Sequence, residues 1–237
     1  MIETISLFGK DISLYYLCWF AGMLTIFLAG WNIRRYFDFS FSRATILVVL
    51  DLILGYLLIW LMSWISGGGE FNGYNYVRVV PVIAIIFIPI SYIFNEPLWK
   101  VSDFLAASGA AMQGVSHLGC VFAGCCHGYP SQWGIYSNIA QEKCFPIQPI
   151  EAIINILIAF VLCWMVKKKK EQKYLFMWYM IMFGATRFVC EFYRNNRKVW
   201  HNISELALYA LASLVIGIIA LVFTKLLSKR SWKDEEK

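Results

Sequence analysis

Two arginines and a glutamate, Arg187, Glu191 and Arg194, occur together inside an otherwise apolar stretch of the chain. Their spacing of i, i+4 and i+7 places all three side chains on one face of a helix. Guanidinium groups bind phosphate oxygens through paired, parallel N–H donors, so two on one stripe suit a phosphorylated ligand. Because an ionisable residue inside a bilayer costs about 2.5 kcal/mol or more, we interpret the stripe as a functional site.

Other polar side chains are expected at the same depth on different helices. Counted from the basic ends of their helices at about 1.5 Å per residue, Arg187 lies roughly 21 Å along one helix and His117 roughly 26 Å along another. Gln148 and Glu151 begin a third apolar stretch, and Tyr15 stands at the start of the first. Two interpretations stay open: a site for a phospholipid head group, or glutamates that only neutralise the arginines in buried pairs fixing helix packing.

The elements that position these residues are membrane spans. The chain is 59% hydrophobic and only 15% charged, whereas an average soluble domain carries roughly 25% charged residues. Apolar runs of about 20 residues, the length that crosses the hydrocarbon core, recur throughout. We place seven spans near residues 12–32, 43–65, 77–94, 100–122, 148–167, 173–193 and 203–226. The sequence thus predicts an all-α integral membrane protein, a single seven-span domain of residues 1–237.

Basic residues gather at one set of span ends. They are Arg34, Arg35, Arg43, Lys100, Lys167, Lys168, Lys169, Lys170, Lys173, Lys225, Lys229, Arg230 and Lys233. Because positive charge marks the cytoplasmic side, we expect the N-terminus outside and the C-terminus in the cytoplasm. The net charge of +6 then reflects the bilayer as partner, and we expect no nucleic-acid binding.

The fourth predicted span carries small residues on every side, which allows neighbouring helices to approach closely. These are Ala106, Ala107, Ser108, Gly109, Ala110, Ala111, Gly114 and Gly119. We expect this span to be the central helix. It runs into residues 119–128 (GCVFAGCCHG), where Gly119, Gly124 and the adjacent cysteines indicate irregular backbone beside a cavity or packed protein.

The cysteines of this turn leave several readings open. Cys120, Cys125 and Cys126 are thiol ligands, but the spacing C-x4-C-C differs from the usual C-x2-C, so we expect no metal. A disulfide from Cys125 or Cys126 to Cys144 suits an oxidising compartment. The commonest outcome for such thiols is packing as small apolar groups. A nucleophilic cysteine is a further alternative, although no neighbour in the sequence marks one as activated.

Three motifs resemble those of the bacterial prolipoprotein diacylglyceryl transferases. Residues 15–22 (YYLCWFAG) resemble the Tyr-initiated first span of that family. Residues 145–151 (FPIQPIE) are similar to the family's His-Pro-x-Gln-Leu-Tyr-Glu segment, and residues 184–194 (GATRFVCEFYR) to its Gly-x-x-Arg-Phe-x-x-Glu-x-x-Arg element. The last match is the most specific. The resemblance covers nearly the full length and is strongest for members with G-C-x3-G-C-C-x-G after the fourth span.

The resemblance implies an enzyme that transfers the diacylglyceryl group of phosphatidylglycerol to the thiol of a lipobox cysteine in a prolipoprotein, releasing glycerol phosphate. It implies a multi-pass protein of the bacterial cytoplasmic membrane, with its active site open to the outer leaflet and no cofactor. Arg187 and Arg194 would hold the lipid phosphate, and Glu191 would orient an arginine. The remaining substrate-binding residues implied are Tyr15, Gln148, Glu151, Gly119, Gly124 and Cys125.

Two residues depart from the family pattern. His117 stands where the family signature has an arginine, and Cys125 where many members have a glutamate. The chain also lacks a His-Gly-Gly sequence, so His117 becomes the candidate for a catalytic role, as base or as phosphate donor. Three alternatives stay open: a phospholipid-dependent transferase with a different acceptor, a non-catalytic lipid-binding protein, and a thiol-redox membrane protein.

Overall fold

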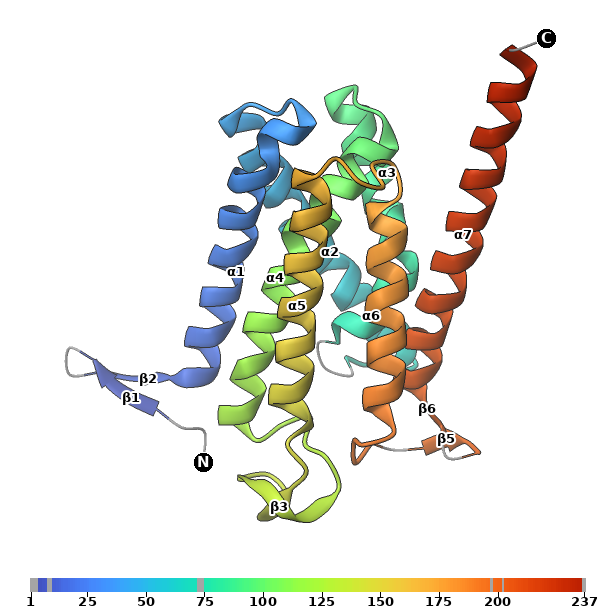
Figure 1. The fold of residues 1–237 in the computed structure, drawn as a ribbon. Coiled ribbons are helices and arrows are strands. Elements are labelled where there is room, and N and C mark those ends of the chain that lie inside the picture. The colour runs from blue at the N-terminus through green and yellow to red at the C-terminus, as the bar shows by residue number, and fades with distance from the viewer. Residues whose placement is uncertain (1–3, 8–9, 72–74, 197, 202, 236–237) are drawn as a thin grey trace.

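Helices running roughly side by side make up most of the protein, for which a computed structural model describes residues 4–7, 10–71, 75–196, 198–201 and 203–235 (Figure 1). Within these residues the α-helices are α1 (Leu14–Ile33), α2 (Phe41–Ser66), α3 (Ala84–Phe94), α4 (Leu98–Ala123), α5 (Ile147–Lys167), α6 (Leu175–Glu191) and α7 (Glu205–Glu235). Each overlaps one of the seven predicted ranges. The predicted bounds are close except for α3, which begins seven residues after the predicted start at 77, and α7, which continues beyond residue 226.

Four helices of the described residues are long and apolar enough to cross a membrane. They are Leu14–Phe37, which joins α1 to the short 3-10 helix η1 (Arg34–Phe37), then Phe41–Ser66, Ile147–Lys167 and Glu205–Ser228. A bent pair of helices gives a fifth if it counts as one span. The protein is therefore a mostly helical membrane protein. Helix α6, at 17 residues, is shorter than the roughly 20 residues of a typical span.

The predicted range 77–94 is not one straight helix. It consists of η2 (Tyr76–Arg78), η3 (Val80–Val82) and α3, and the axis bends by 59° between Tyr76–Val82 and Ala84–Phe94. Pro81 lies within η3 and Pro89 within α3. A proline removes a backbone donor and its ring clashes with the preceding turn, so a helix kinks or breaks there.

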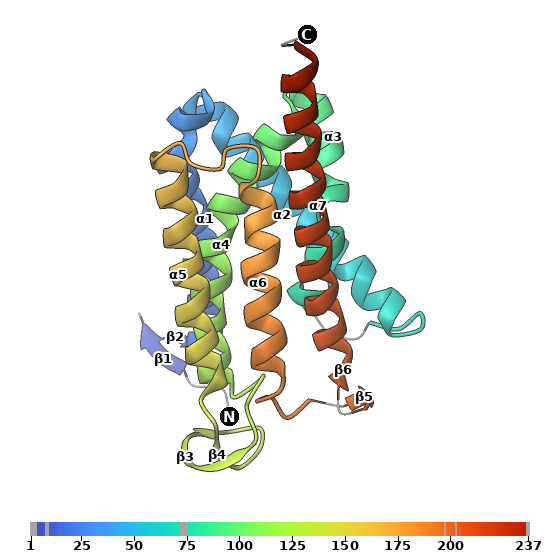
Figure 2. The ribbon, with the colours of Figure 1, turned by 45° about the vertical axis from the view of Figure 1, so that its right-hand side comes forward.

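Helix α4 lies at the centre, with α1, α5 and α6 packed around it (Figures 1 and 2). A Cβ on Gly114 would come within 2.6 Å of Ile156 Cγ1 and 2.9 Å of the Ala152 carbonyl oxygen on α5. A Cβ on Gly119 would come within 2.9 Å of the Tyr15 carbonyl oxygen on α1. Small residues thus let three backbones approach closely, which confirms the prediction made for this helix.

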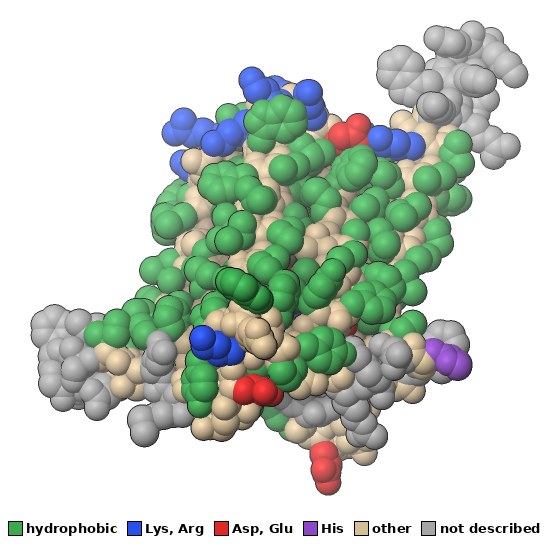
Figure 3. Space-filling view, turned by 60° about the horizontal axis from the view of Figure 1, so that its bottom comes forward, with side chains coloured by type: hydrophobic (Ala, Val, Ile, Leu, Met, Phe, Trp, Pro, Cys, Tyr) green, Lys and Arg blue, Asp and Glu red, His purple; other side chains and the backbone are tan. Residues whose placement is uncertain are grey.

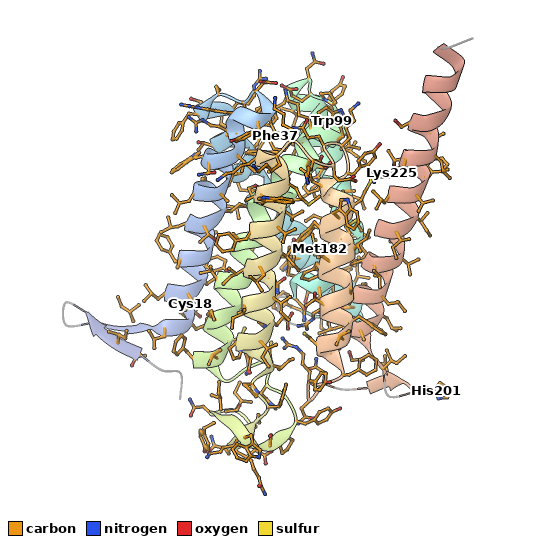
Figure 4. The ribbon with its side chains drawn as sticks, viewed as in Figure 1. Cys18, Phe37, Trp99, Met182, His201 and Lys225 are labelled. Carbon is orange, nitrogen blue, oxygen red and sulfur yellow. The ribbon has the colours of Figure 1, made fainter. Side chains whose placement is uncertain are left out.

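The surface separates into an apolar belt and a basic end. Hydrophobic side chains cover the flank seen in Figure 3, while lysines and arginines gather at one end. In Figure 4, Phe37, Trp99 and Lys225 lie toward that basic end, and Cys18 and His201 toward the other. Apolar exposure on this scale is rare in soluble monomers and fits contact with lipid.

Short antiparallel hairpins, which the sequence did not predict, cover the end opposite the basic residues (Figure 1). In the described part of the chain they are β1 (Thr4–Leu7) with β2 (Lys10–Ser13), β3 (Pro130–Ser137) with β4 (Glu142–Cys144), and β5 (Lys198–Trp200) with β6 (Ile203–Ser204). Ser137 Oγ donates to the Gly124 carbonyl oxygen at 2.8 Å, which ties the second hairpin to the end of α4.

Candidate functional site

A cluster of four charged side chains lies at the hairpin end of the bundle. Glu151 comes from the second turn of α5, Arg187 and Glu191 from the last turns of α6, and Arg194 from just beyond α6. Their exposed fractions are 1%, 3%, 1% and 0%, respectively. We call these residues the Arg–Glu cluster. Arg187 and Glu191 share one face of α6, as predicted, and form an ion pair between Arg187 Nη2 and Glu191 Oε2 at 3.0 Å, whereas Arg194 was predicted on the same helix but follows its end.

Glu151 is the centre of the cluster. Arg187 Nη1 donates to both Glu151 carboxylate oxygens at 2.7 Å, and Arg194 Nη2 donates to Oε2. One carboxylate on α5 therefore holds both arginines of the α6 stripe. The sequence placed Glu151 at the same level as the arginines but did not indicate that it binds both.

Glu191 connects α6 to the chain that follows it. Its Oε1 accepts hydrogen bonds from Ser204 Oγ, at 2.8 Å, and from Asn196 Nδ2, while its Oε2 pairs with Arg187. The carboxylate is thus held on two sides and cannot swing away from Arg187 without breaking these bonds. This geometry suits the predicted role of Glu191 in orienting an arginine.

Arg194 connects the end of α6 to the turn after α4. Its Nη1 donates to the Cys126 carbonyl oxygen at 2.8 Å, and Asn195 N donates to the His127 carbonyl oxygen at 3.2 Å. Burial disfavours the charged guanidinium, but the charge of Glu151 beside it outweighs burial, so the pKa of Arg194 lies above its ordinary value. Arg194 therefore stays protonated and holds three elements together.

His117 on α4 completes the site. Its Nε2 lies 2.8 Å from Arg194 Nη2. A guanidinium group only donates hydrogen bonds, so in its contact with Arg194 the His117 Nε2 atom is the acceptor. The same nitrogen also lies 3.5 Å from Glu151 Oε2, so His117 faces both members of this ion pair.

Among the described residues, the Nε donor of each arginine makes no hydrogen bond, although Arg194 Nε lies 4.0 Å from Glu191 Oε2. The cluster holds two positive and two negative side chains, so its formal charge is balanced. In the part of the chain that the structure describes, Arg187 Nε and Arg194 Nε are buried and have no hydrogen-bond partner. A buried donor without a partner is costly and is rare in folded proteins. The two Nε–H groups are therefore candidates for binding the oxygens of an incoming anion.

The other predicted site residues shape the surroundings of the cluster. Gln148 Nε2 donates to the Cys125 carbonyl oxygen at 3.0 Å. Tyr15 meets Gly119 through its backbone, and a Cβ on Gly124 would come within 2.9 Å of Asn138 N. In this structure these five residues join α1, α5 and the hairpin to the end of α4. The sequence missed Asn196, Ser204 and the Cys126 carbonyl, for which no motif or helical spacing supplied a signal.

The thiol groups of Cys120, Cys125 and Cys126 also meet here. All three sulfur atoms lie within 4.8 Å of one another. Cys144 is not part of this group. Within the described residues, no disulfide joins Cys144 to Cys125 or Cys126.

The model of one protein family matches residues 78–224, well over half of the chain, and it is described as prolipoprotein diacylglyceryl transferase. The chain belongs to this family. The matched region contains His117, the three clustered cysteines and the whole Arg–Glu cluster, whereas Tyr15 lies before it. The charged site is thus a feature of a prolipoprotein diacylglyceryl transferase family member.

Three relatives carry that activity in their names. A phosphatidylglycerol–prolipoprotein diacylglyceryl transferase of Clostridium tetani is 31% identical over 134 residues, which is 52% of this chain and 53% of the relative. A second, numbered 2, from Clostridium perfringens is 26% identical over 191 residues, 73% and 74% of the two chains. A third from Campylobacter lari is 28% identical over 177 residues, 67% and 64%. The alignment with the Clostridium tetani relative thus spans about half of that protein.

Proposed function

We propose that this protein transfers the diacylglyceryl group of phosphatidylglycerol to the thiol of a lipobox cysteine in a prolipoprotein, releasing glycerol phosphate. Family membership and the names of the relatives support this proposal. The observation that carries it is the buried arginine pair, in which Arg187 and Arg194 are both held by Glu151 and both keep an unpaired Nε–H.

The proposal includes the membrane arrangement. The chain forms one domain of residues 1–237 with seven spans in the bacterial cytoplasmic membrane, its N-terminus outside and its C-terminus in the cytoplasm. Support comes from the gathering of basic side chains at one end of the bundle (Figure 3) and of the Arg–Glu cluster at the other. With this orientation the cluster opens toward the outer leaflet.

The reaction is an alkylation of sulfur. The acceptor thiol loses its proton, and its sulfur forms a bond to the glycerol carbon that carries the phosphate. The bond between that carbon and the phosphate oxygen breaks, and the electron pair leaves with glycerol phosphate. The residues of the site must therefore stabilise negative charge on the leaving phosphate and promote loss of the thiol proton.

Arg187 and Arg194 fulfil the first requirement. Their Nε–H donors are buried, and donors in a site without water stabilise developing charge more strongly than donors in water. A phosphate reaching them competes with Glu151 for the same guanidinium groups, so its arrival weakens the bonds that now close the cluster. His117, whose Nε2 accepts from Arg194, then acts by positioning that arginine rather than by removing the thiol proton.

Mass spectrometry of a lipobox peptide incubated with purified protein and phosphatidylglycerol tests the proposal. We expect a mass gain of one diacylglyceryl group with the wild type. Arg187→Ala should lower the rate about 100-fold or more, as expected on removing a donor to developing negative charge. Arg43→Ala is the matched control, because Arg43 pairs with Glu96 near the basic end and its side chain is 44% exposed. A fully active, folded Arg187→Ala protein would refute the phosphate role.

A transferase with a different acceptor is the second candidate. The observation that favours it is His117 at the place of the family arginine, together with Cys125 at the place of a glutamate. If phosphatidylglycerol is consumed with another acceptor while every lipobox peptide stays unmodified, this candidate replaces the first. If Arg187→Ala changes neither lipid turnover nor peptide modification but lipid still binds, the protein is a non-catalytic lipid-binding member.

A further inference from the structure

Three thiols converge from two structural elements beside the Arg–Glu cluster. Cys120 lies in the last turns of α4, and Cys125 and Cys126 lie in the turn that follows it. Their sulfur atoms are all within 4.8 Å of one another. We expected no metal because the spacing C-x4-C-C differs from C-x2-C, in which a short turn brings two thiols together. Here the end of α4 brings the first thiol to the other two.

The backbone holds this arrangement at a cost. Cys126 has a φ of 58°, in the left-handed region, and so does Gly124, with a φ of 71°. A left-handed residue other than glycine costs about 1–3 kcal/mol and persists only where its surroundings enforce it, commonly at functional sites. The turn at Cys126 permits two consecutive side chains to approach the same point, which an extended chain would prevent.

Residues of other elements fix Cys125 and Cys126 through their backbone carbonyl groups. Gln148 Nε2 donates to the Cys125 carbonyl oxygen at 3.0 Å, and Arg194 Nη1 donates to the Cys126 carbonyl oxygen at 2.8 Å. The backbone of Cys125 is therefore fixed to α5, and the backbone of Cys126 is fixed to the Arg–Glu cluster. Such supporting bonds are what a metal site needs to orient its ligands.

The ligand set suits zinc. Three thiolates are soft ligands at Zn–S distances of about 2.3 Å, which place tetrahedral sulfur atoms about 3.8 Å apart. The present sulfur positions need shifts of at most about 1 Å to reach that geometry. Three protein ligands leave the fourth position open, as in catalytic rather than structural zinc sites. Three thiolates and one Zn²⁺ carry a net charge of −1, and Arg194 is the cation nearest to them through its bond to the Cys126 carbonyl oxygen.

We propose that Cys120, Cys125 and Cys126 bind a zinc ion whose open position takes the acceptor thiol of the lipobox cysteine. The inference rests on the proposed transferase function and supplies its missing step. A thiol on zinc is deprotonated outright. The thiol proton passes to water, the sulfur forms its bond to the glycerol carbon, the carbon–oxygen bond breaks, and glycerol phosphate leaves. The zinc then exchanges the neutral thioether product for the next thiol, and no oxidant or reductant takes part.

The same site accounts for the departures from the family pattern. The chain has no His-Gly-Gly histidine to serve as base, and His117 Nε2 already contacts Arg194 Nη2 at 2.8 Å. A thiophilic metal removes the need for such a base. Cys125, at the place of a family glutamate, becomes a ligand.

Metal content is the first measurement. The full-length protein is purified in detergent with a reductant that does not bind zinc and a tag without histidine or cysteine. We expect near-stoichiometric zinc in the wild type and strongly reduced zinc in Cys120→Ser, Cys125→Ser and Cys126→Ser. Cys163→Ser is the matched control, because this thiol on α5 faces the Ala107 carbonyl oxygen away from the three ligands. Gel filtration confirms that each variant is folded.

Cobalt(II) substitution then tests the open position. We expect a thiolate-to-cobalt charge-transfer band that grows when a lipobox peptide is added, and no change with a peptide in which serine replaces the lipobox cysteine. Bound metal without this difference overturns the assignment of the fourth position.

The outcomes separate this inference from the proposed function. If peptide modification continues in protein without zinc and in all three serine variants, the zinc site is refuted and the transferase stands. If zinc binds and the cobalt spectrum responds but no lipobox peptide is ever modified, the transferase proposal fails instead. If two of the three cysteines still form a disulfide in the presence of the reductant, the metal site is refuted in favour of a redox role.

Discussion

Replacing Glu151 with glutamine tests whether one carboxylate holds the Arg–Glu cluster together. Glutamine keeps the shape but replaces one acceptor oxygen with an NH2 group, which then faces arginine donors. The cluster changes from two positive and two negative groups to two positive and one negative. Removing one partner of a buried ion pair costs about 3–5 kcal/mol, because the remaining charge is left without compensation. For a chain of this size that corresponds to a fall in Tm of about 6–20 °C.

Thermal unfolding in detergent measures the effect, and a double-mutant cycle with Arg187→Gln isolates its cause. The double variant retains one arginine and one glutamate, so its charge is balanced again. We expect its loss of stability to be about 1–3 kcal/mol smaller than the sum of the two single losses. Glu96→Gln is the matched control, since Glu96 pairs with Arg43 and Lys100 near the surface, and we expect it to cost less than about 1 kcal/mol.

Two results would refute this reasoning. In the first, Glu151→Gln unfolds at the same temperature as the Glu96→Gln control. In the second, the losses in the cycle add without coupling. Either result would mean that the two arginines do not depend on Glu151 for compensation of their charge.

Three further predictions concern the bundle. Asp103 on α4 accepts backbone N–H groups at the start of α6 at 2.7 and 2.9 Å, so Asp103→Ala should lower the free energy of unfolding by about 2 kcal/mol, measured by thermal unfolding in detergent. Gly114→Ala places a Cβ within 2.6 Å of Ile156 Cγ1 and should cost about 1–3 kcal/mol in the same assay. The Lys225 hydrogen bond lowers the pKa of Glu171. A carboxylate with a lowered folded-state pKa contributes stability above its unfolded pKa and loses it as the pH falls, so the wild type should exceed Glu171→Gln by less than about 1 kcal/mol at pH 7 and equal it at low pH.

Each of these has a contrary outcome. An Asp103→Ala protein as stable as the wild type would show that α6 begins without help from α4. A Gly114→Ala protein of unchanged or greater stability would show that α4 and α5 do not approach as closely as described. A stability difference between wild type and Glu171→Gln that grows toward low pH would reverse the sign of the argument.

The closed cluster has a consequence for the order of events. In the present arrangement Glu151 accepts from Arg187 Nη1 and Arg194 Nη2, and within the described residues the Nε donors of both arginines make no hydrogen bond. A phosphate that takes over Arg187 Nη1 or Arg194 Nη2 must displace Glu151. Because Arg194 also holds the Cys126 carbonyl and His117, binding of phosphate is coupled to the position of the cysteine turn.

Local patterns in the amino-acid sequence were enough to predict the features that depend on neighbours along the chain. Runs of apolar residues set the helices α1, α2 and α5 close to their predicted bounds, because the length of such a run is local information. The i, i+4 spacing placed Arg187 and Glu191 on one helix face, because helical geometry alone sets that relation, whereas Arg194 follows the end of α6. The small residues of α4 likewise predicted a central helix with close neighbours.

The packing of the helices, which no local pattern reveals, sets which helix supplies the partner of each side chain in the site. Glu151 binds both arginines because α5 packs beside α6, and no pattern within either segment encodes that pairing. Cys120 meets Cys125 and Cys126 because α4 ends in a left-handed turn that Gln148 and Arg194 hold from other elements. Contacts between segments distant in sequence depend on the packing of whole surfaces, whereas the spacing of side chains on one helix depends only on the local backbone.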